Sequence, residues 1–346
     1  YGLQLSEKDN FKINPIDTGT FMHDVIDDFF NKIREKSFNI KELSEEEINE
    51  IVEEIIDEKL NLNKNFIFSS SPKYKSLSTR LKRVVLKSMK YIVESLKYSK
   101  FEVLGNEVEF KEGKEYSPIT IELESGQKVE ITGKIDRIDI AKLDNDKYVR
   151  IIDYKSSAKN IDLNQVYAGL QLQLITYLDA VCQEEDLMPA GVLYFNLIDP
   201  TIKSKKSLTD EEIEDKIRKK FKMQGLILAD VDIVKMMDTK LETGSSDVIP
   251  AYIGKEGTLS NNRSSVVNRK QFEYLQKYTN RLIRQISEEI LSGNIDIRPY
   301  YNVKNKKTPC EYCGFKSICN FSGGDCRNGY NYINNLEKEV VLEMMR

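Results

Sequence analysis

The chain has 346 residues, of which 40% are hydrophobic and 31% charged, and its formal net charge at pH 7 is −4. These values are typical of a globular protein that buries a sizeable core in one large domain or two modest ones. No apolar run approaches membrane-spanning length, so a membrane partner is not expected. The chain begins at Tyr1 without a Met or a signal-like apolar stretch, and we therefore expect a fragment of a longer cytoplasmic polypeptide.

Apolar spacing and turn residues predict alternating helices and strands along the chain. The first helix begins near residues 17–20, with Phe21, Val25 and Phe29 on its apolar side. The predicted elements are, in chain order, helical stretches to residue 60 and over 76–98, strands at 101–110, 119–123, 128–141 and 148–155, a helix over 163–181, a strand at 190–197, helices over 208–223 and 230–239, a polar loop or hairpin at 242–263, and a long helix over 268–292. A β-hairpin, helix and strand in this order predict an α/β core wrapped by helices.

Two of these strands carry the most informative residues. Asp136 lies in the first and Asp153 in the second, and the polar segment 143–146 is short enough to join them as a hairpin. The hairpin brings the two carboxylates side by side, with Lys155 two residues further on the same face. Two carboxylates and a lysine at one sheet edge suit metal-assisted phosphodiester hydrolysis. The same alternation is also typical of an ordinary half-solvated antiparallel sheet.

Three polar residues on predicted helices are further site candidates. His23 is the only histidine; a lone histidine on an apolar helix is more often structural, although imidazole suits a divalent ion where carboxylates supply the charge. Gln173 and Tyr177 are four residues apart and share one helix face. They form either the polar rim of an amphipathic helix or, beside the acidic strands, groups that hold a phosphate or a nucleotide backbone.

Charge is unevenly distributed along the chain. Residues 41–60 form an acidic helix, residues 73–100 a basic one, and further basic clusters lie at 203–206, 218–220 and 304–307. Segregated charge of this kind can build a groove that follows phosphates on an overall acidic protein. Lysine-rich surfaces that only confer solubility are the alternative interpretation.

The cysteines form a second cluster of chemistry-bearing residues. Cys310, Cys313 and Cys319 follow a Cys-x-x-Cys-x5-Cys pattern in a short, turn-rich segment. Thiolates at this spacing in a cytosolic chain indicate zinc or an iron–sulfur cluster rather than disulfides. A fourth thiolate is needed, and Cys326 is close enough in sequence, whereas Cys182 is expected to be a buried structural thiol.

In this order the motifs resemble the RecB-type nucleases of the PD-(D/E)XK superfamily that carry an iron–sulfur cluster. The resemblance covers almost the whole chain and is strongest to the AddB branch, the B subunits of bacterial ATP-dependent helicase/deoxyribonucleases. It implies an α/β fold with a restriction-endonuclease-like core, that is, a mixed sheet flanked by helices, with helical insertions and a Cys-rich C-terminal segment. The expected parts are a helical part with the motif His at 1–100, the nuclease core at 101–200, an insertion and long helix at 201–300, and the iron–sulfur segment and tail at 301–346.

The resemblance also implies roles for individual residues. The ligands of Mg²⁺ or Mn²⁺ would be His23, Asp136, Asp153 and the carbonyl of Tyr154. Lys155 would position or deprotonate the attacking water, and Gln173 and Tyr177 would hold the strand and Lys155 in place. Cys310, Cys313 and Cys319 would bind a [4Fe–4S] cluster. In such proteins the fourth cysteine lies upstream of the segment that matches Tyr1, so we expect the cluster to be incomplete in this chain unless Cys326 substitutes.

The implied function is a metal-dependent DNA exonuclease that processes double-strand break ends for recombination. It would act on single strands and duplex ends with an AddA-like partner subunit. ATP hydrolysis would lie elsewhere, since the sequence has no Walker motif. A stand-alone CRISPR-associated exonuclease shares the motifs, but the long insertions at 41–100 and 204–263 argue against it. A catalytically silent DNA-binding scaffold is the third hypothesis, and the presence of Asp136, Asp153 and Lys155 argues against that.

Overall fold

A six-stranded mixed sheet forms the centre of the computed structural model, which describes residues 15–61, 71–184, 187–319, 321–323 and 329–346. The strands, in spatial order, are β1 (Glu102–Phe110), β4 (Gly133–Leu143), β5 (Asp146–Lys155), β6 (Leu187–Asn196), β7 (Gln224–Leu228) and β10 (Val266–Val267). This sheet and its helices confirm the predicted α/β class, and β7 and β10 add strands from the segment 201–300.

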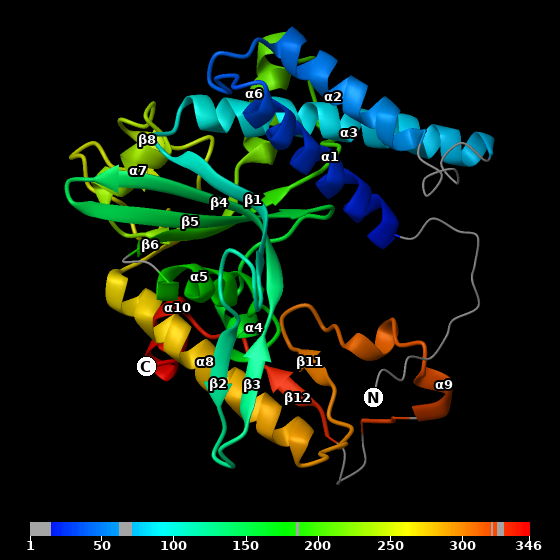
Figure 1. The fold of residues 1–346 in the computed structure, drawn as a ribbon, viewed down its shortest axis with the longest axis vertical. Helices are drawn as coiled ribbons and strands as arrows, with labels where there is room; N and C mark the ends of the chain where they lie inside the picture. The colour runs from blue at the N-terminus through cyan, green and yellow to red at the C-terminus, as the bar shows by residue number, and fades with distance from the viewer. Residues whose placement is uncertain (1–14, 62–70, 185–186, 320, 324–328) are drawn as a thin grey trace.

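Helices lie on both faces of the sheet (Figure 1). The first layer contains α1 (Pro15–Glu35), α2 (Glu45–Leu60), α3 (Pro72–Lys97) and α6 (Asp210–Phe221). The opposite layer contains α4 (Leu163–Tyr167), α5 (Gln173–Glu184), α8 (Arg269–Leu291) and α10 (Lys338–Met344), and α7 (Val231–Met237) follows β7. The smaller elements are the pairs β2 (Ile119–Glu122) with β3 (Lys128–Ile131), β8 (Gly244–Ser245) with β9 (Tyr252–Ile253) and β11 (Tyr300–Asn302) with β12 (Asn331–Ile333), the 3₁₀ turn η2 (Pro309–Glu311) and α9 (Lys316–Cys319).

The hairpin between β4 and β5 forms as its sequence predicts. The last pair of its ladder is Leu143 with Asp146, so only two residues make the turn, and Asp144 has a left-handed φ of 53°. Short polar residues tolerate this conformation, and two-residue turns of this kind match the twist of the strands they join. The chain then crosses through α4 and α5 and returns as β6, parallel to β5.

Two predicted elements are each divided in the structure. The strand expected over 128–141 is two strands, because β3 pairs with β2 in a separate arm whereas β4 joins the main sheet. The prediction of one helix over 163–181 is also wrong, because the segment forms two helices, α4 and α5. The first of them ends before Gly169, which adopts a φ of +81°. Apolar spacing continues through both breaks, which is why periodicity alone missed them. Leu170 continues the helical spacing of Val166 and Leu174 in the sequence, but its side chain is 42% exposed.

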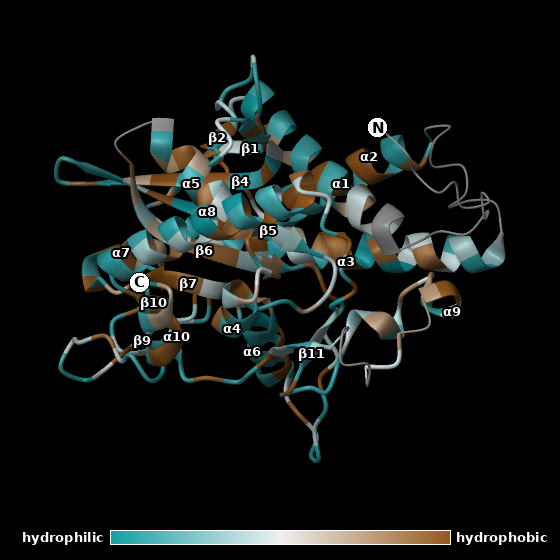
Figure 2. Cartoon of the chain, turned by 90° about the horizontal axis from the view of Figure 1, so that it is seen from below, coloured by the Kyte–Doolittle hydropathy of each residue, from teal (hydrophilic) through white to brown (hydrophobic). Residues whose placement is uncertain are grey.

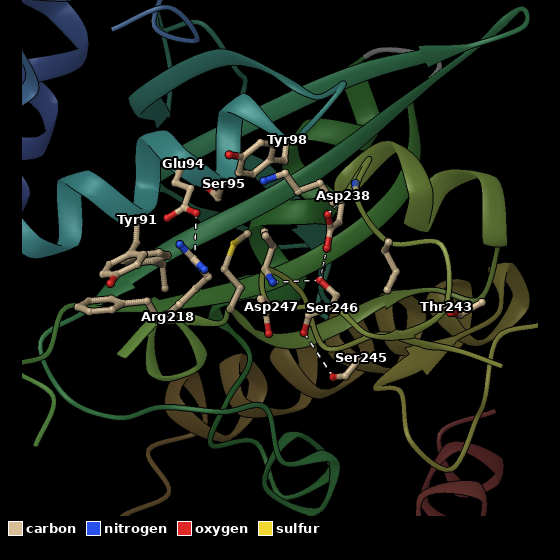
Figure 3. A pocket seen from close by; sticks show the side chains of 16 residues that line it. Tyr91, Glu94, Ser95, Tyr98, Arg218, Asp238, Thr243, Ser245, Ser246 and Asp247 are labelled. Atoms are coloured by element: carbon tan, nitrogen blue, oxygen red, sulfur yellow. Dashed lines mark hydrogen bonds and ion pairs between the residues drawn. The ribbon is translucent and has the colours of Figure 1, made fainter. Parts of the chain in front are cut away.

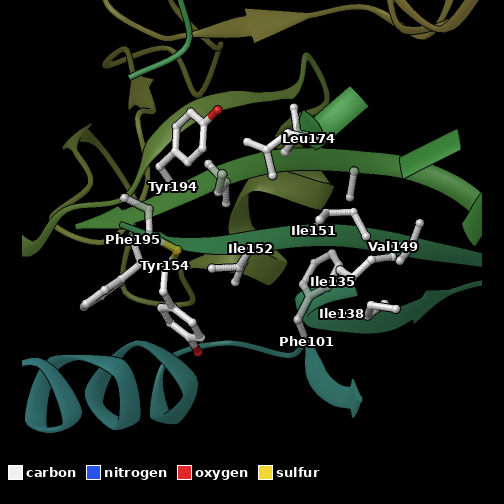
Figure 4. Close-up of a cluster of buried hydrophobic side chains, with 14 of the residues drawn as sticks. Phe101, Ile135, Ile138, Val149, Ile151, Ile152, Tyr154, Leu174, Tyr194 and Phe195 are labelled. Carbon is white, nitrogen blue, oxygen red and sulfur yellow. The ribbon is translucent and has the colours of Figure 1, made fainter. Parts of the chain in front are cut away.

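Apolar side chains fill the space between the sheet and its two helix layers. Ile138 and Ile151 are fully buried in the middle of the sheet, with Phe101 and Leu174 close by (Figure 4). Hydrophobic residues gather in the strands and on adjoining helix faces, whereas outer loops are mainly hydrophilic (Figure 2). This arrangement lets buried apolar area stabilise the strands that carry the polar site.

A buried charged cluster lies on the α1–α3 side of the same strands. Asp139 accepts two hydrogen bonds from Arg137, both at 2.8 Å, and one from Arg150 Nε at 2.9 Å. All three side chains are at most 1% exposed. Arg137 Nη1 also donates to the Tyr154 hydroxyl at 3.1 Å, so the cluster joins β4 and β5 close to Asp136 and Asp153.

The acidic and basic helices predicted from the sequence pack against each other. Lys82 lies 3.5 Å from Glu53, and Lys90 lies 3.2 Å from Glu45, so α2 neutralises part of the charge on α3. The α3 cluster is therefore not a purely phosphate-facing surface. Within the described ranges, no helix combines the length and the apolar character needed to cross a bilayer.

Candidate active site

Three acidic residues from three neighbouring strands form a row. The pairing of Arg137 with Ile152 places Asp136 of β4 beside Asp153 of β5. The pairs on either side of Glu107 in β1 place that residue on the other flank of Asp136. The juxtaposition of Asp136 and Asp153 follows the hairpin prediction, whereas Glu107 was not among the predicted residues.

His23 reaches this row from α1. Its Nε2 lies 2.9 Å from the carbonyl oxygen of Tyr154, and its Nδ1 lies 3.5 Å from Asp136 Oδ2 and 3.7 Å from Glu107 Oε1. Burial disfavours the charged imidazole, but hydrogen bonds to Asp136 and Glu107 outweigh it and raise the pKa of His23 to about 10. Without a metal ion, His23 is therefore a proton-carrying bridge between the acidic residues and the backbone of β5.

An unusual backbone conformation and the ammonium group of Lys134 hold Glu107 in place. Its φ of 52° is left-handed, a conformation that costs a residue with a Cβ about 1 kcal/mol or more and that clusters at functional sites. Its Oε2 lies 2.5 Å from Lys134 Nζ. Burial raises the pKa of Glu107, but hydrogen bonds from His23 and Lys134 outweigh it and lower that pKa overall. Only the register of β1 against β4 reveals this residue as part of the site.

Lys155 stands at the opposite end of the row. Its Nζ lies 2.6 Å from Asp153 Oδ2 and donates to Gln173 Oε1 at 3.1 Å. Gln173 in turn donates to the Tyr177 hydroxyl at 2.8 Å, so the two residues predicted to share a helix face are linked to Lys155. Burial and the charge of Asp136 raise the pKa of Asp153 to about 6.

The backbone of Tyr154 joins the ligand candidates to the buried charged cluster. Its amide donates to Asp136 Oδ2 at 2.7 Å, and its carbonyl accepts from His23. Its side chain points to the face of the sheet opposite Asp153 and Lys155, where its hydroxyl accepts a hydrogen bond from Arg137. The carbonyl is thus held by His23 and by the anchored side chain of its own residue.

The residues present fit a divalent cation. The nearest ligand atoms of His23, Glu107 and Asp136 all lie within 4.8 Å of one another. Asp153 is 1% exposed, and its buried Oδ1 has no hydrogen-bond partner among the described residues, which leaves an acceptor available for a cation. Carboxylate and carbonyl oxygens with one imidazole are a donor set that suits Mg²⁺ or Mn²⁺.

The predicted cluster cysteines lie in a different part of the molecule. Cys310 is in η2, Cys319 ends α9, and both Cys313 and Cys319 are exposed. In the described part of the chain the three thiols do not converge into a compact ligand group, and Cys326 lies outside the described residues. Cys182 in α5 is only partly buried, less than expected, and burial raises its pKa to about 12.

A separate cavity of about 250 Å³ lies between α3, α6 and the loop after α7 (Figure 3). Arg218 pairs with Glu94 on one side of it, and Ser246 donates to Asp238 at 2.6 Å on the other. None of the predicted site residues lines this cavity. It is therefore distinct from the acidic row.

Comparison with known proteins identifies the family. The profile of the PD-(D/E)XK nuclease superfamily matches residues 1–320. The whole chain aligns with the B subunit of the ATP-dependent helicase/deoxyribonuclease of Ruminiclostridium cellulolyticum at 41% identity, covering 30% of that protein. The B subunit of the same enzyme from Clostridium novyi matches the whole chain at 42% identity over 31% of its length, and that from Acetivibrio thermocellus at 39% over 30%. The chain thus spans less than a third of the length of these curated relatives. With its mixed sheet flanked by helices, the chain belongs to the PD-(D/E)XK nuclease superfamily.

Proposed function

We propose that this chain is a divalent-metal-dependent deoxyribonuclease domain that degrades DNA from its ends. The observation that carries the proposal is the row of Glu107, Asp136 and Asp153. His23 contacts this row from α1, and Lys155 pairs with Asp153 at its end. Three carboxylates in a partly buried position repel one another, and such a cluster is stable only with cations nearby. A nuclease needs this arrangement, because the phosphate substrate is itself an anion.

Each residue of the site has a chemical task in this proposal. His23, Asp136, Asp153 and the Tyr154 carbonyl would hold Mg²⁺ or Mn²⁺, and Glu107 is close enough to join them. A bound divalent ion makes water more acidic and offsets charge on the phosphate. His23 would lose its proton when it becomes a ligand, so metal binding should release a proton.

Lys155 is the residue we propose for positioning the attacking water. Its ammonium group is held from two sides, by Asp153 and by Gln173, so it can also offset the charge that develops on the phosphate. Gln173 is itself held by Tyr177. These two residues would fix the angle at which Lys155 approaches the substrate.

The names of the relatives support a role within a larger enzyme. They are subunits of ATP-dependent helicase/deoxyribonucleases, so we propose that the domain acts with an AddA-like partner subunit. Its substrates would be single strands and duplex ends at double-strand breaks, in the cytoplasm. The outcome would be resection of the break for recombination.

We also propose that Cys310, Cys313 and Cys319 bind three irons of a [4Fe–4S] cluster. Their spacing supports this ligand set. Because the fourth cysteine is expected upstream of Tyr1, the test uses a longer chain that includes it: after anaerobic purification this chain should contain iron and acid-labile sulfide, and Cys313→Ser should lower both. Cys182→Ser is the matched control, and equal iron content in all three proteins would contradict the assignment.

Degradation of end-labelled single-stranded DNA tests the nuclease directly. Wild-type protein should cleave with Mg²⁺ or Mn²⁺ but not with EDTA, and Lys155→Ala should abolish cleavage while DNA binding persists. Lys142→Ala, an exposed lysine on β4, should cleave like the wild type. DNA binding without cleavage in every protein would favour the silent scaffold instead.

A further inference from the structure

A cavity of about 570 Å³ lies between α4, the β11–β12 pair and residues 334–344. Figure 1 shows β11 and β12 next to α4, on the same side of the sheet as α5. Leu170 lines this cavity and precedes Gln173 by three residues, so their Cα atoms are at most about 11 Å apart. Gln173 in turn contacts Lys155 in the site. A DNA strand cut at the acidic row would therefore reach the cavity within a few nucleotides.

The lining of this cavity combines aromatic rings with side-chain amides. Tyr167 stacks one face of its ring on Tyr278, with centroids 5.3 Å apart and an interplanar angle of 14°, so only its other face can meet a ligand. Tyr300, half-buried on β11, is a second ring in the lining. Asn331 donates to a backbone carbonyl at 3.0 Å, and the exposed Asn334 side chain makes no hydrogen bond among the described residues. Aromatic faces and available amides are the groups that bind an unstacked nucleobase.

The charge around the cavity suits a polyanion. None of its described lining residues is acidic, whereas carboxylates line the 250 Å³ cavity near α3. Arg298 lines it with a side chain that is 47% exposed and pairs with Asp296 at 3.5 Å. The exposed turn after β11 adds Lys304, Lys306 and Lys307, which form no ion pair with the described residues. On a chain of net charge −4, positive charge is thus in local excess beside an aromatic cavity, as contact with phosphates requires.

We infer that this cavity binds one unstacked base of the strand that is cut, a few nucleotides from the scissile phosphate. The inference rests on the proposed nuclease function and deepens it, because it assigns a second contact with the substrate. The base stacks against the rings of Tyr167 and Tyr300, and Asn331 and Asn334 face its polar edge. Bases in a duplex are paired and stacked, so only a single strand can supply this base. The cavity therefore makes the domain select single strands.

Binding of two strands of equal length, one with normal bases and one made entirely of abasic nucleotides, tests the inference. Affinity is measured by fluorescence anisotropy in EDTA, so that no cleavage occurs. Tyr300→Ala should weaken binding of the normal strand by about fivefold or more, because it removes a stacking surface, and should leave binding of the abasic strand unchanged. Tyr300→Phe keeps the ring and should bind both strands like the wild type. Tyr252→Ala, at a half-buried strand tyrosine outside the cavity, is the matched control and should change neither affinity.

Photo-cross-linking of the wild type gives a second measurement that needs no substitution. A single strand carrying 5-iodouracil should cross-link to the peptides that contain Tyr167 or Tyr300, as identified by mass spectrometry. Cross-links confined to other surfaces would overturn the inference.

The outcomes separate this inference from the nuclease proposal. An equal loss of affinity for both strands in Tyr300→Ala would show a structural effect and overturn the inference. Unchanged affinity for the normal strand would also overturn it, as expected if another polypeptide segment covers the cavity. Both results leave metal-dependent cleavage by the wild type intact, whereas a wild type that binds no single-stranded DNA would overturn the proposed function itself.

Discussion

Replacing Asp139 by Asn should destabilise the whole domain through the buried charged cluster. Asn has almost the same shape as Asp and can still accept a hydrogen bond, so the substitution removes mainly the negative charge. Arg137 and Arg150 then remain buried at 1% exposure or less without their shared counter-ion. Breaking a buried ion pair by removing one partner costs about 3–5 kcal/mol.

The corresponding shift in melting temperature follows from the length of the chain. Unfolding entropy near 60 °C is about 2.1 cal/mol/K per residue, or about 0.7 kcal/mol/K for 346 residues. A loss of about 3–5 kcal/mol therefore lowers Tm by about 4–7 °C. Asp146→Asn, an exposed carboxylate on the same hairpin, should change stability by less than about 0.5 kcal/mol.

The pH dependence of this difference provides a second check. Burial raises the pKa of Asp139, but the charges of Arg137 and Arg150 outweigh it and lower that pKa below the usual 3.8. A lowered pKa in the folded state means stability that is complete above the unfolded value and lost as the pH falls below it. The difference in unfolding free energy between wild type and Asp139→Asn should thus be constant from pH 7 to pH 5 and shrink only below about pH 4. A Tm difference under about 1 °C at pH 7, measured by circular dichroism, would refute the reasoning.

Three further outcomes are expected. Asp136→Ala should abolish metal-dependent cleavage and leave DNA affinity within about twofold in a filter-binding assay; retained cleavage would remove Asp136 from the site. Gly225→Ala should cost about 2 kcal/mol or more in urea unfolding, because its Cβ would lie 2.1 Å from the Val192 carbonyl oxygen at a φ of 152°, and an unchanged midpoint would contradict this. Cys182 should react with iodoacetamide at pH 8 at least about tenfold more slowly than the exposed thiols of the Cys-rich segment, since burial raises its pKa to about 12; equal labelling by mass spectrometry would show the thiol to be ionised.

The parts of the site that could be predicted from sequence are those set by local geometry. Asp136 and Asp153 meet because alternation along two strands and a two-residue turn determine their register. Gln173 and Tyr177 share a face because helical spacing is regular. In each case the relation depends on residues that are close in sequence or joined by one tight turn.

The remaining features depend on long-range packing. Glu107 enters the site because β1 pairs with β4 in one particular register and because its own backbone is left-handed. The divisions near Thr132 and Gly169 arise from a strand that changes sheets and from a glycine with positive φ. His23 is placed by the docking of α1, which no local pattern describes. Short buried strands such as β7 also carry too little periodicity to be distinguished from loops.

The separation of the site residues along the chain offers a way to control the enzyme. His23 and Glu107 precede the exposed connection at residues 111–115, whereas Asp136, Asp153 and Lys155 follow it. A chain cut in this connection would leave His23 and Glu107 on one fragment and Asp136, Asp153 and the Tyr154 carbonyl on the other, so neither fragment would have the full ligand set. Pairing of β1 with β4 would bring the halves together again. The fold is therefore suited to a split nuclease whose activity reports on the association of two fused proteins.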